Sequence, residues 1–305
     1  GGIMIPAMEK EGYPKEFATA VNSTSGCLGI MIPPSIPLIL FGSTAGVSIS
    51  DLFVATIVPG ILMGCALMLV SYVICVRRKY GKTVARAKFA EMMKALYEAK
   101  WAIMVPVIVL GGIYGGICSP TEAATISIFY SLIVSLFIYR TIKIRDLPKI
   151  MLEGIHSYAP ILIILSAAVA FARVITLMNV ATIVSEAVLS AISSKVVILL
   201  LINVLLLFVG MIMDTGPAIL VFTPVLLPVA EAIGVDPIHF GIIMCVNLAI
   251  GFVTPPMGAN LFVASNLSKV SVFDIARKAV PFILAFLIAL LLITFVPQIS
   301  MFLLQ

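Results

Sequence analysis

Long apolar segments separated by short polar ones make up most of the chain. Each segment holds enough consecutive apolar residues to cross, or to dip into, a hydrocarbon core of about 30 Å. A straight helix over 17–43 would exceed that thickness at about 1.5 Å per residue, so a broken or tilted element is favoured there. We expect spans at about 17–43, 51–76, 101–118, 121–139, 157–178, 238–265 and 279–303. The pattern predicts an all-α polytopic membrane protein.

Residues 196–230 follow a different pattern. Two apolar arms, 196–209 and 218–230, flank the small polar centre GMIMDTGP at Gly210–Pro217. Each arm is too short to span alone, so we expect a re-entrant helical hairpin that enters and leaves on one side. We interpret residues 1–8 as the exit arm of an equivalent hairpin, whose first arm would precede this sequence.

Two apolar segments contain the same helix-breaking motif, GIMIPPSIP from Gly29 and GFVTPPMGAN from Gly251. Consecutive prolines remove two backbone donors, and in hydrocarbon the freed carbonyls need protein or a polar cavity to satisfy them. An offset of 222 residues also relates other pairs, among them Pro6 with Pro228, Gly12 with Gly234, Ser43 with Ser265 and Pro59 with Pro281. The chain therefore contains an internal repeat.

The two copies of the repeat should be inverted in the membrane. Five expected spans separate the two hairpins, and an odd number places the second hairpin on the opposite face. Inverted repeats whose broken helices meet near the midplane are typical of secondary transporters.

Basic residues set the expected orientation. They concentrate after the span at 51–76, between 140 and 149, and at Lys269, Arg277 and Lys278, all on one side that we expect to be cytoplasmic. The loops 44–50 and 231–237 contain no Lys or Arg and are expected outside. The basic segments 84–100 and 145–156 are amphipathic, which is typical of helices lying in the membrane interface.

Composition excludes several classes of protein. Hydrophobic residues make up 62% of the chain and charged residues 11%, and mean hydropathy is +1.21, which excludes an ordinary soluble domain. The net charge of +5 is no sign of nucleic-acid binding, because the basic residues lie in loops between spans. Five scattered Cys and two isolated His predict no zinc site, and HExxH is absent, so we do not expect an enzyme.

Five phrases resemble the large membrane subunit of tripartite ATP-independent periplasmic (TRAP) transporters, of the DctM/SiaM type. They run from one end of the chain to the other: IMIPAMEKEGYP (Ile3–Pro14), NSTSGCLGIMIPPSIPLILFG (Asn22–Gly42), GGIYGGICSPTEAA (Gly111–Ala124), GMIMDTGPAILVFTPVLLPVA (Gly210–Ala230) and GFVTPPMGANLFVAS (Gly251–Ser265). The resemblance implies an elevator transporter of the ion-transporter superfamily. It also implies that the family's subunit has an additional N-terminal part, beyond the residues present here.

The resemblance further implies uptake of an organic acid, such as sialic acid or a C4-dicarboxylate, across the bacterial inner membrane with Na⁺ as coupling ion. The implied partners are a small membrane subunit of the DctQ/SiaQ type and a periplasmic substrate-binding protein of the DctP/SiaP type. The implied transport domain comprises 1–50 and 196–268. The implied scaffold comprises 51–195, with arm helices 84–100 and 145–156, and a C-terminal helix within 269–305. Alternatives are a binding-protein-independent sodium/anion symporter and a non-transporting scaffold.

Polar residues near the breaks and the hairpin centre are the candidate ligands, because transporters hold Na⁺ with unwound backbone carbonyls and side-chain oxygens. The sodium candidates are Asn22, Ser23, Ser25, Gly29, Gly210, Asp214, Thr215, Gly251, Thr254 and Gly258. The substrate candidates are Asn22, Ser25, Pro33, Asn247, Pro255 and Asn260.

Each candidate also has a purely structural interpretation. For Asp214, which we favour as a functional residue, the structural alternative is capping of the second hairpin arm. Serines and threonines in spans commonly bond to the preceding turn, and glycines permit close helix packing. Glu122 follows Ser119 and Pro120 at the spacing of a capping box, and that interpretation is favoured over a role in transport.

Overall fold

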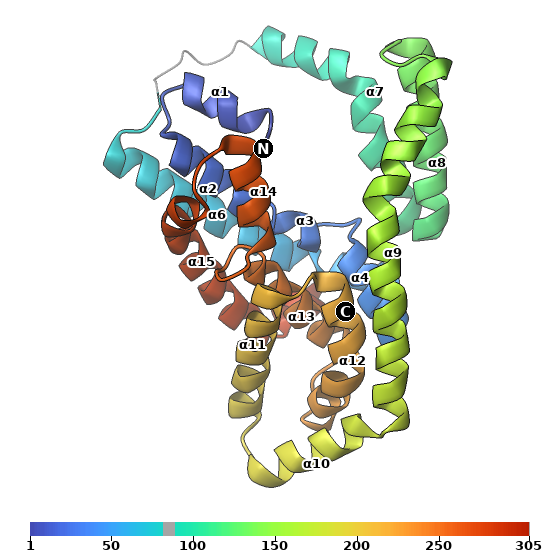
Figure 1. Ribbon diagram of the computed structural model, residues 1–305, viewed down its shortest axis with the longest axis vertical. Helices are drawn as coiled ribbons and strands as arrows, with labels where there is room; N and C mark the ends of the chain where they lie inside the picture. The colour runs from blue at the N-terminus through green and yellow to red at the C-terminus, as the bar shows by residue number, and fades with distance from the viewer. Residues whose placement is uncertain (82–88, 305) are drawn as a thin grey trace. The chain divides into compact units, whose positions relative to one another are not determined.

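The computed structural model describes residues 1–81 and 89–304, and within these ranges its regular secondary structure is entirely helical (Figure 1). Contacts divide the chain into two compact units. The first comprises Gly1–Lys82 with Leu165–Gln305, and the second comprises Thr83–Ile164. An all-α fold agrees with the hydropathy pattern.

The first unit contains both copies of the repeat. Its N-terminal half holds α1 (Met4–Lys10), α2 (Lys15–Ser25), α3 (Leu28–Met31), α4 (Ile36–Ala45), α5 (Ile49–Ala55) and α6 (Ile57–Arg78). Its C-terminal half begins in the last part of α9 (Leu147–Leu177) and continues with α10 (Val180–Ala191), α11 (Lys195–Ile212), α12 (Thr215–Ala232), α13 (Pro237–Gly251), α14 (Ala259–Ser268), α15 (Val272–Phe295), α16 (Gln298–Met301) and the 3-10 turn η3 (Phe302–Leu304).

Both proline pairs interrupt their helices, as the sequence predicts. The first span is divided into α2, α3 and α4, and the backbone is extended at Ile32 and Ser35, on either side of Pro33-Pro34. The second is divided into α13 and α14, and Gly258 adopts a left-handed φ of 47° at the start of α14. The peptide bond within each proline pair is cis.

Equivalent parts of the two copies pack crosswise. Helix α14 of the second copy contacts α2 of the first, α13 contacts α4, and the equivalent helices α6 and α15 contact each other. The Cys27 thiol donates a hydrogen bond to the Ala249 carbonyl at 3.0 Å, and these two buried residues are 222 positions apart. Contact between equivalent positions is expected when the copies are related by a local two-fold axis.

The second unit contains α7 (Phe89–Tyr114), α8 (Pro120–Ile133) with its π-helical continuation η1 (Val134–Ile138), the 3-10 turn η2 (Ile144–Asp146) and the first part of α9. Side chains of the α8–η1 helix hold it against α7. The Tyr130 hydroxyl donates to the Trp101 carbonyl at 3.0 Å, and the Tyr139 hydroxyl donates to the Glu98 carbonyl at 3.0 Å.

Three expectations about element boundaries are wrong. The arms of the hairpin, α11 and α12, have 18 residues each, and both are long and apolar enough to be candidate spans. Helical hydrogen bonding continues into the polar centre, so only Met213 and Asp214 separate the arms. The premise that each arm is too short to cross is therefore incorrect, whereas re-entrance itself stays a prediction.

The amphipathic segments are not separate helices. Residues 89–100 belong to α7, which continues through Pro106, and residues 147–156 belong to α9. No glycine or proline lies between 89 and 105, so nothing in the sequence ends a helix there. Residues 84–88 of the expected interfacial helix lie outside the described residues.

The third error is an omission, because no element was expected between 179 and 195. Helix α10 occupies residues 180–191, and it is bent by 62° from α9 at a short break. Asn179 forms the bend with a left-handed φ of 53°. Asparagine tolerates this conformation better than most residues do.

Helices α11 and α13 approach each other through two glycines. A Cβ atom on Gly251 would overlap the Gly210 backbone, lying 2.6 Å from the Gly210 Cα, and a Cβ on Gly210 would lie 3.0 Å from the Leu248 Cα. Backbone atoms cannot move aside as a flexible side chain can. The absence of both side chains therefore sets how closely the hairpin packs on the second broken helix.

We expect Gly251→Ala to destabilise the protein by about 1–3 kcal/mol, because the added methyl group overpacks this contact. Gly64→Ala in α6 is the matched control, since its Cβ would meet nothing within 4 Å. Thermal unfolding in detergent measures both variants. Equal melting temperatures for the two would contradict the proposed role of the glycine contact.

Candidate functional site

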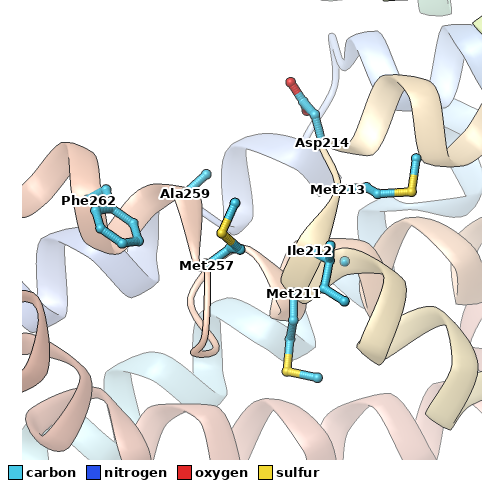
Figure 2. A pocket seen from close by; sticks show the side chains of 8 residues that line it. Met211, Ile212, Met213, Asp214, Met257, Ala259 and Phe262 are labelled. Carbon is cyan, nitrogen blue, oxygen red and sulfur yellow. The ribbon is translucent and has the colours of Figure 1, made fainter.

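The tip of the α11–α12 hairpin and the second helix break line one cavity of about 410 Å³ (Figure 2). The hairpin contributes Gly210 to Asp214, the break contributes Met257, and the start of α14 contributes Ala259 and Phe262. In Figure 2, Met257 lies between the two elements, and the carboxylate of Asp214 points away from it. Most of the lining is apolar, and Asp214 supplies its one charged side chain.

Two helices begin beside this cavity. The backbone leaves α11 in an extended conformation at Met213, and α12 starts after Asp214. Helix α14 starts after Gly258. The first turns of a helix carry free N–H groups and partial positive charge, so both helix starts favour an anion.

Asp214 occupies the N-cap position of α12 without capping it. Its side chain accepts no hydrogen bond from the helix backbone, and its contact is with the hydroxyl of Thr215 at 3.3 Å. The side chain is exposed. The capping interpretation therefore accounts for the position of Asp214 but not for its carboxylate.

The other candidates around the second break have structural contacts. The Thr254 hydroxyl donates to the Ile250 carbonyl at 2.7 Å, although its oxygen still has lone pairs to accept or coordinate. Gly251 lies against Gly210, as described above. These contacts agree with the structural alternatives and do not test ion binding.

A second, smaller cavity of about 110 Å³ brings together candidates from both copies. It is lined in part by Asn22 and Ser23 of α2 and by Asn260 of α14. The Asn260 side-chain amide donates to the Ser23 carbonyl at 3.4 Å. The Ser23 hydroxyl is buried and, among the described residues, has no hydrogen-bond partner. An unpaired buried oxygen is a candidate ligand position, because leaving it unsatisfied is costly.

Asn22 and Ser25 mainly bond within their own helix. Asn22 donates to the Ala18 carbonyl at 2.9 Å, and Ser25 donates to the Asn22 carbonyl at 2.9 Å. Five candidates line the cavities: Gly210 and Asp214 the first, and Asn22, Ser23 and Asn260 the second. The other nine line neither cavity: Ser25, Gly29, Pro33, Thr215, Asn247, Gly251, Thr254, Pro255 and Gly258.

Asn247 instead belongs to a buried polar cluster that the sequence analysis missed. Its amide donates to Asn203 Oδ1 at 2.6 Å and to the Ile243 carbonyl at 2.8 Å. Asn203 in turn donates to the Thr294 hydroxyl at 3.2 Å. The signal was available, since Asn203 and Thr294 are isolated polar residues within apolar helices. The cluster joins α11, α13 and α15.

The capping interpretation of Glu122 is confirmed. The Ser119 N–H donates to Glu122 Oε2 at 2.7 Å, and the Glu122 N–H donates to the Ser119 hydroxyl at 3.4 Å. These reciprocal bonds complete the capping box at the start of α8.

The fold defines a polytopic helical membrane protein. The described part of the chain contains seven helices long and apolar enough to cross a membrane, or up to eight if the bent α9–α10 pair is one span. The family model for the DctM component of tripartite ATP-independent periplasmic transporters matches residues 1–299, and the chain belongs to this family. Its members are transporter permeases and not enzymes.

Several relatives carry names that state what they transport. The isethionate TRAP transporter permease protein DctMQ of Oleidesulfovibrio alaskensis is 45% identical over 99% of this chain, and the chain spans 48% of that relative. The C4-dicarboxylate large permease DctM of Pseudomonas aeruginosa is 37% identical over 99% of the chain and 69% of its own length. The sialic acid large permease SiaM of Vibrio cholerae is 34% identical over 99% of the chain and 71% of its own length.

We expect Asp214→Ala to change the free energy of unfolding by less than about 0.5 kcal/mol, because no capping bond is lost. The matched control is Asp236→Ala at the start of α13. Asp236 accepts hydrogen bonds from the Ile238 and His239 N–H groups at 2.8 and 3.3 Å, so its loss should cost about 1 kcal/mol. Thermal unfolding of both variants measures the difference. Similar losses would show that Asp214 does cap α12.

Proposed function

We propose that this chain forms the large permease part of a TRAP transporter that couples the uptake of an organic acid to inward movement of Na⁺. The observation that carries the proposal is the cavity where the hairpin tip meets the second break. Broken helices and hairpins that meet in this way provide both free backbone carbonyls for a cation and helix N-termini for an anion. The named relatives agree in class, since each name refers to an organic acid.

Two sodium positions follow from the two groups of candidates. One would lie at the second hairpin, with Gly210, Asp214, Thr215, Gly251, Thr254 and Gly258 as the available ligands. The other would lie at the first break, with Asn22, Ser23, Ser25 and Gly29 as the available ligands. Backbone carbonyls would supply the glycine contributions.

The substrate carboxylate is proposed to bind at the helix starts beside the first cavity, with Asn260 and Pro255 near it. The N–H groups at the starts of α12 and α14 would stabilise its charge. Asn22, Ser25, Pro33 and Asn247 remain further substrate candidates. Asp214 would repel an anion unless a bound cation balanced its charge, so ion binding before substrate binding is favoured.

Sodium can supply enough free energy for accumulation. One elementary charge moving through 100 mV corresponds to about 2.3 kcal/mol, and a factor of ten in concentration corresponds to about 1.4 kcal/mol. Two Na⁺ per monovalent acid would therefore drive strong accumulation without ATP.

An elevator movement is proposed, in which the hairpins and broken helices slide as one body against a scaffold. Packing favours including α15 in the moving body, in addition to the expected 1–50 and 196–268. The Thr294 hydroxyl bonds to Asn203, and the Thr294 carbonyl lies 3.4 Å from His239 Nε2. Independent movement of α15 would break these buried contacts, which is costly in a medium without water.

A small membrane subunit and a periplasmic binding protein are the proposed partners, and the bacterial inner membrane is the proposed location. The basis is the tripartite description of the family, together with the basic residues on one side of the expected topology. The experiments on transport therefore use the complete permease with both partners.

Reconstitution in vesicles tests the coupling. We expect uptake of the organic acid to require an inward sodium gradient and the binding protein, and to stop when Na⁺ is replaced by choline. A screen of the binding protein's ligands supplies the acid to use. Uptake that ignored the sodium gradient would disprove coupling, and uptake without the binding protein would favour a two-component symporter.

Asp214→Asn tests the site in the same vesicles. We expect sodium-dependent uptake to fall at least about tenfold, because the amide keeps the shape of the side chain but loses its charge. Asp236→Asn is the matched control, since asparagine also caps helices well and uptake should be unchanged. Full activity of Asp214→Asn would remove this residue from the site.

A further inference from the structure

A charged groove of about 470 Å³ lies within the first compact unit, apart from the two cavities described above. It is formed by the start of α2, the end of α6 and the start of α15. Its polar lining consists of Glu16, Arg78, Tyr80, Asp274, Arg277 and Lys278. We call these six residues the headgroup groove. Three cationic and two anionic side chains therefore converge on one space.

The five charged residues of the groove form no ion pair with one another or with any other described residue. The spacing of Asp274 and Lys278 on α15 is i,i+4, at which opposite charges commonly pair on a helix surface. Here the two side chains instead both line the groove. Charges of both signs are thus available to a bound molecule that carries charges of both signs.

Aromatic packing gives the groove a firm wall. The ring of Phe17 lies 5.3 Å from that of Tyr80 and 6.2 Å from that of Phe282, measured between centroids. The chain turns sharply on both sides of Tyr80, with a left-handed φ of 54° at Lys79 and 84° at Gly81. This turn directs Tyr80 back onto Phe17. Aromatic residues beside basic ones are typical of the level of lipid head groups.

An exposed apolar strip leads away from the groove along α15. Arg277 and Pro281 line the groove, and Leu284 and Ile288 follow on the same face at helical spacing. Leu284 is 56% exposed and Ile288 is 63% exposed. Because α15 is a candidate span, this face lies where hydrocarbon would surround it. The polar groove and the apolar strip together match a molecule with a charged head and long acyl chains.

We propose that the headgroup groove binds a phospholipid whose head group carries a phosphate and a primary ammonium, as phosphatidylethanolamine does. The guanidinium groups of Arg78 and Arg277, with the Lys278 ammonium, would bind the phosphate. The carboxylates of Glu16 and Asp274 would accept hydrogen bonds from the lipid ammonium. The acyl chains would lie along the strip formed by Leu284 and Ile288. The proposal does not depend on which acid is transported.

Lipid binding to the purified permease tests this site. Native mass spectrometry and thermal shift would use short-chain phosphatidylethanolamine, phosphatidylcholine, phosphatidylglycerol and inorganic phosphate. We expect phosphatidylethanolamine to bind and stabilise most strongly, because a quaternary ammonium donates no hydrogen bonds and glycerol carries no positive charge. Equal stabilisation by all three lipids would overturn the proposal. The same stabilisation from inorganic phosphate without a lipid would also overturn it.

Variants locate the binding to the groove. Arg277→Gln combined with Lys278→Gln should weaken phosphatidylethanolamine binding at least about tenfold. Arg77→Gln is the matched control, because Arg77 is exposed at the same end of α6 but does not line the groove. Glu16→Gln combined with Asp274→Asn should abolish the preference over phosphatidylglycerol while phosphate binding persists.

The same variants distinguish a lipid from a protein occupant. If the groove holds an acidic segment of a partner subunit, the double Gln variant will lose that partner during purification and will keep its bound lipid. That result would overturn the lipid proposal. If the double Gln variant keeps the partner and binds about tenfold less lipid, the lipid proposal is supported.

Discussion

The fold depends on satisfying broken backbone inside a membrane. Each Pro-Pro pair removes two donors from a helix, and hydrocarbon offers no water to the carbonyls left behind. The broken helices therefore lie against one another, with α14 on α2 and α13 on α4. The Cys27 thiol bonds to the Ala249 carbonyl, and Asn260 bonds to the Ser23 carbonyl. Each copy thus supplies one side-chain donor to a carbonyl near the break of the other copy, and the Asn260 N–H bonds to the Phe252 carbonyl within its own copy at 3.0 Å.

Close packing and polar contacts position the hairpin on the second broken helix. The missing side chains of Gly210 and Gly251 allow two helices to touch through their backbones. The Asn203–Asn247–Thr294 cluster adds hydrogen bonds where no water would compete for them. Asn247 Oδ1 is buried without a described partner, as is the Ser23 hydroxyl. Such unsatisfied atoms carry a free-energy cost, which a bound cation or water would relieve at the Ser23 cavity.

Much of the architecture could be predicted from local patterns. Hydropathy indicated the membrane class, and the proline pairs located both breaks to within a few residues. The capping box at Ser119 and Glu122 was correct because it involves only neighbours along the chain. The errors concern where helices end. Helix α7 continues through Lys100 and Trp101 although the hydrophobic pattern changes there. The backbone hydrogen bonds of a helix do not depend on the polarity of its side chains. No glycine or proline lies at the bend at Asn179, so the sequence pattern did not predict it.

The sequence by itself determined the membrane class, the repeat, the broken helices and the residues that merit testing. It did so because proline chemistry, hydropathy and a constant offset are properties of the chain alone. The tertiary structure decided which of those residues meet. It joined Asn22, Ser23 and Asn260 from opposite copies, assigned Asn247 to a buried cluster, and showed that the Asp214 carboxylate does not cap its helix. The first outcome depends on packing between segments more than 200 residues apart, and the cluster joins helices 44 and 91 residues apart, which no local pattern records.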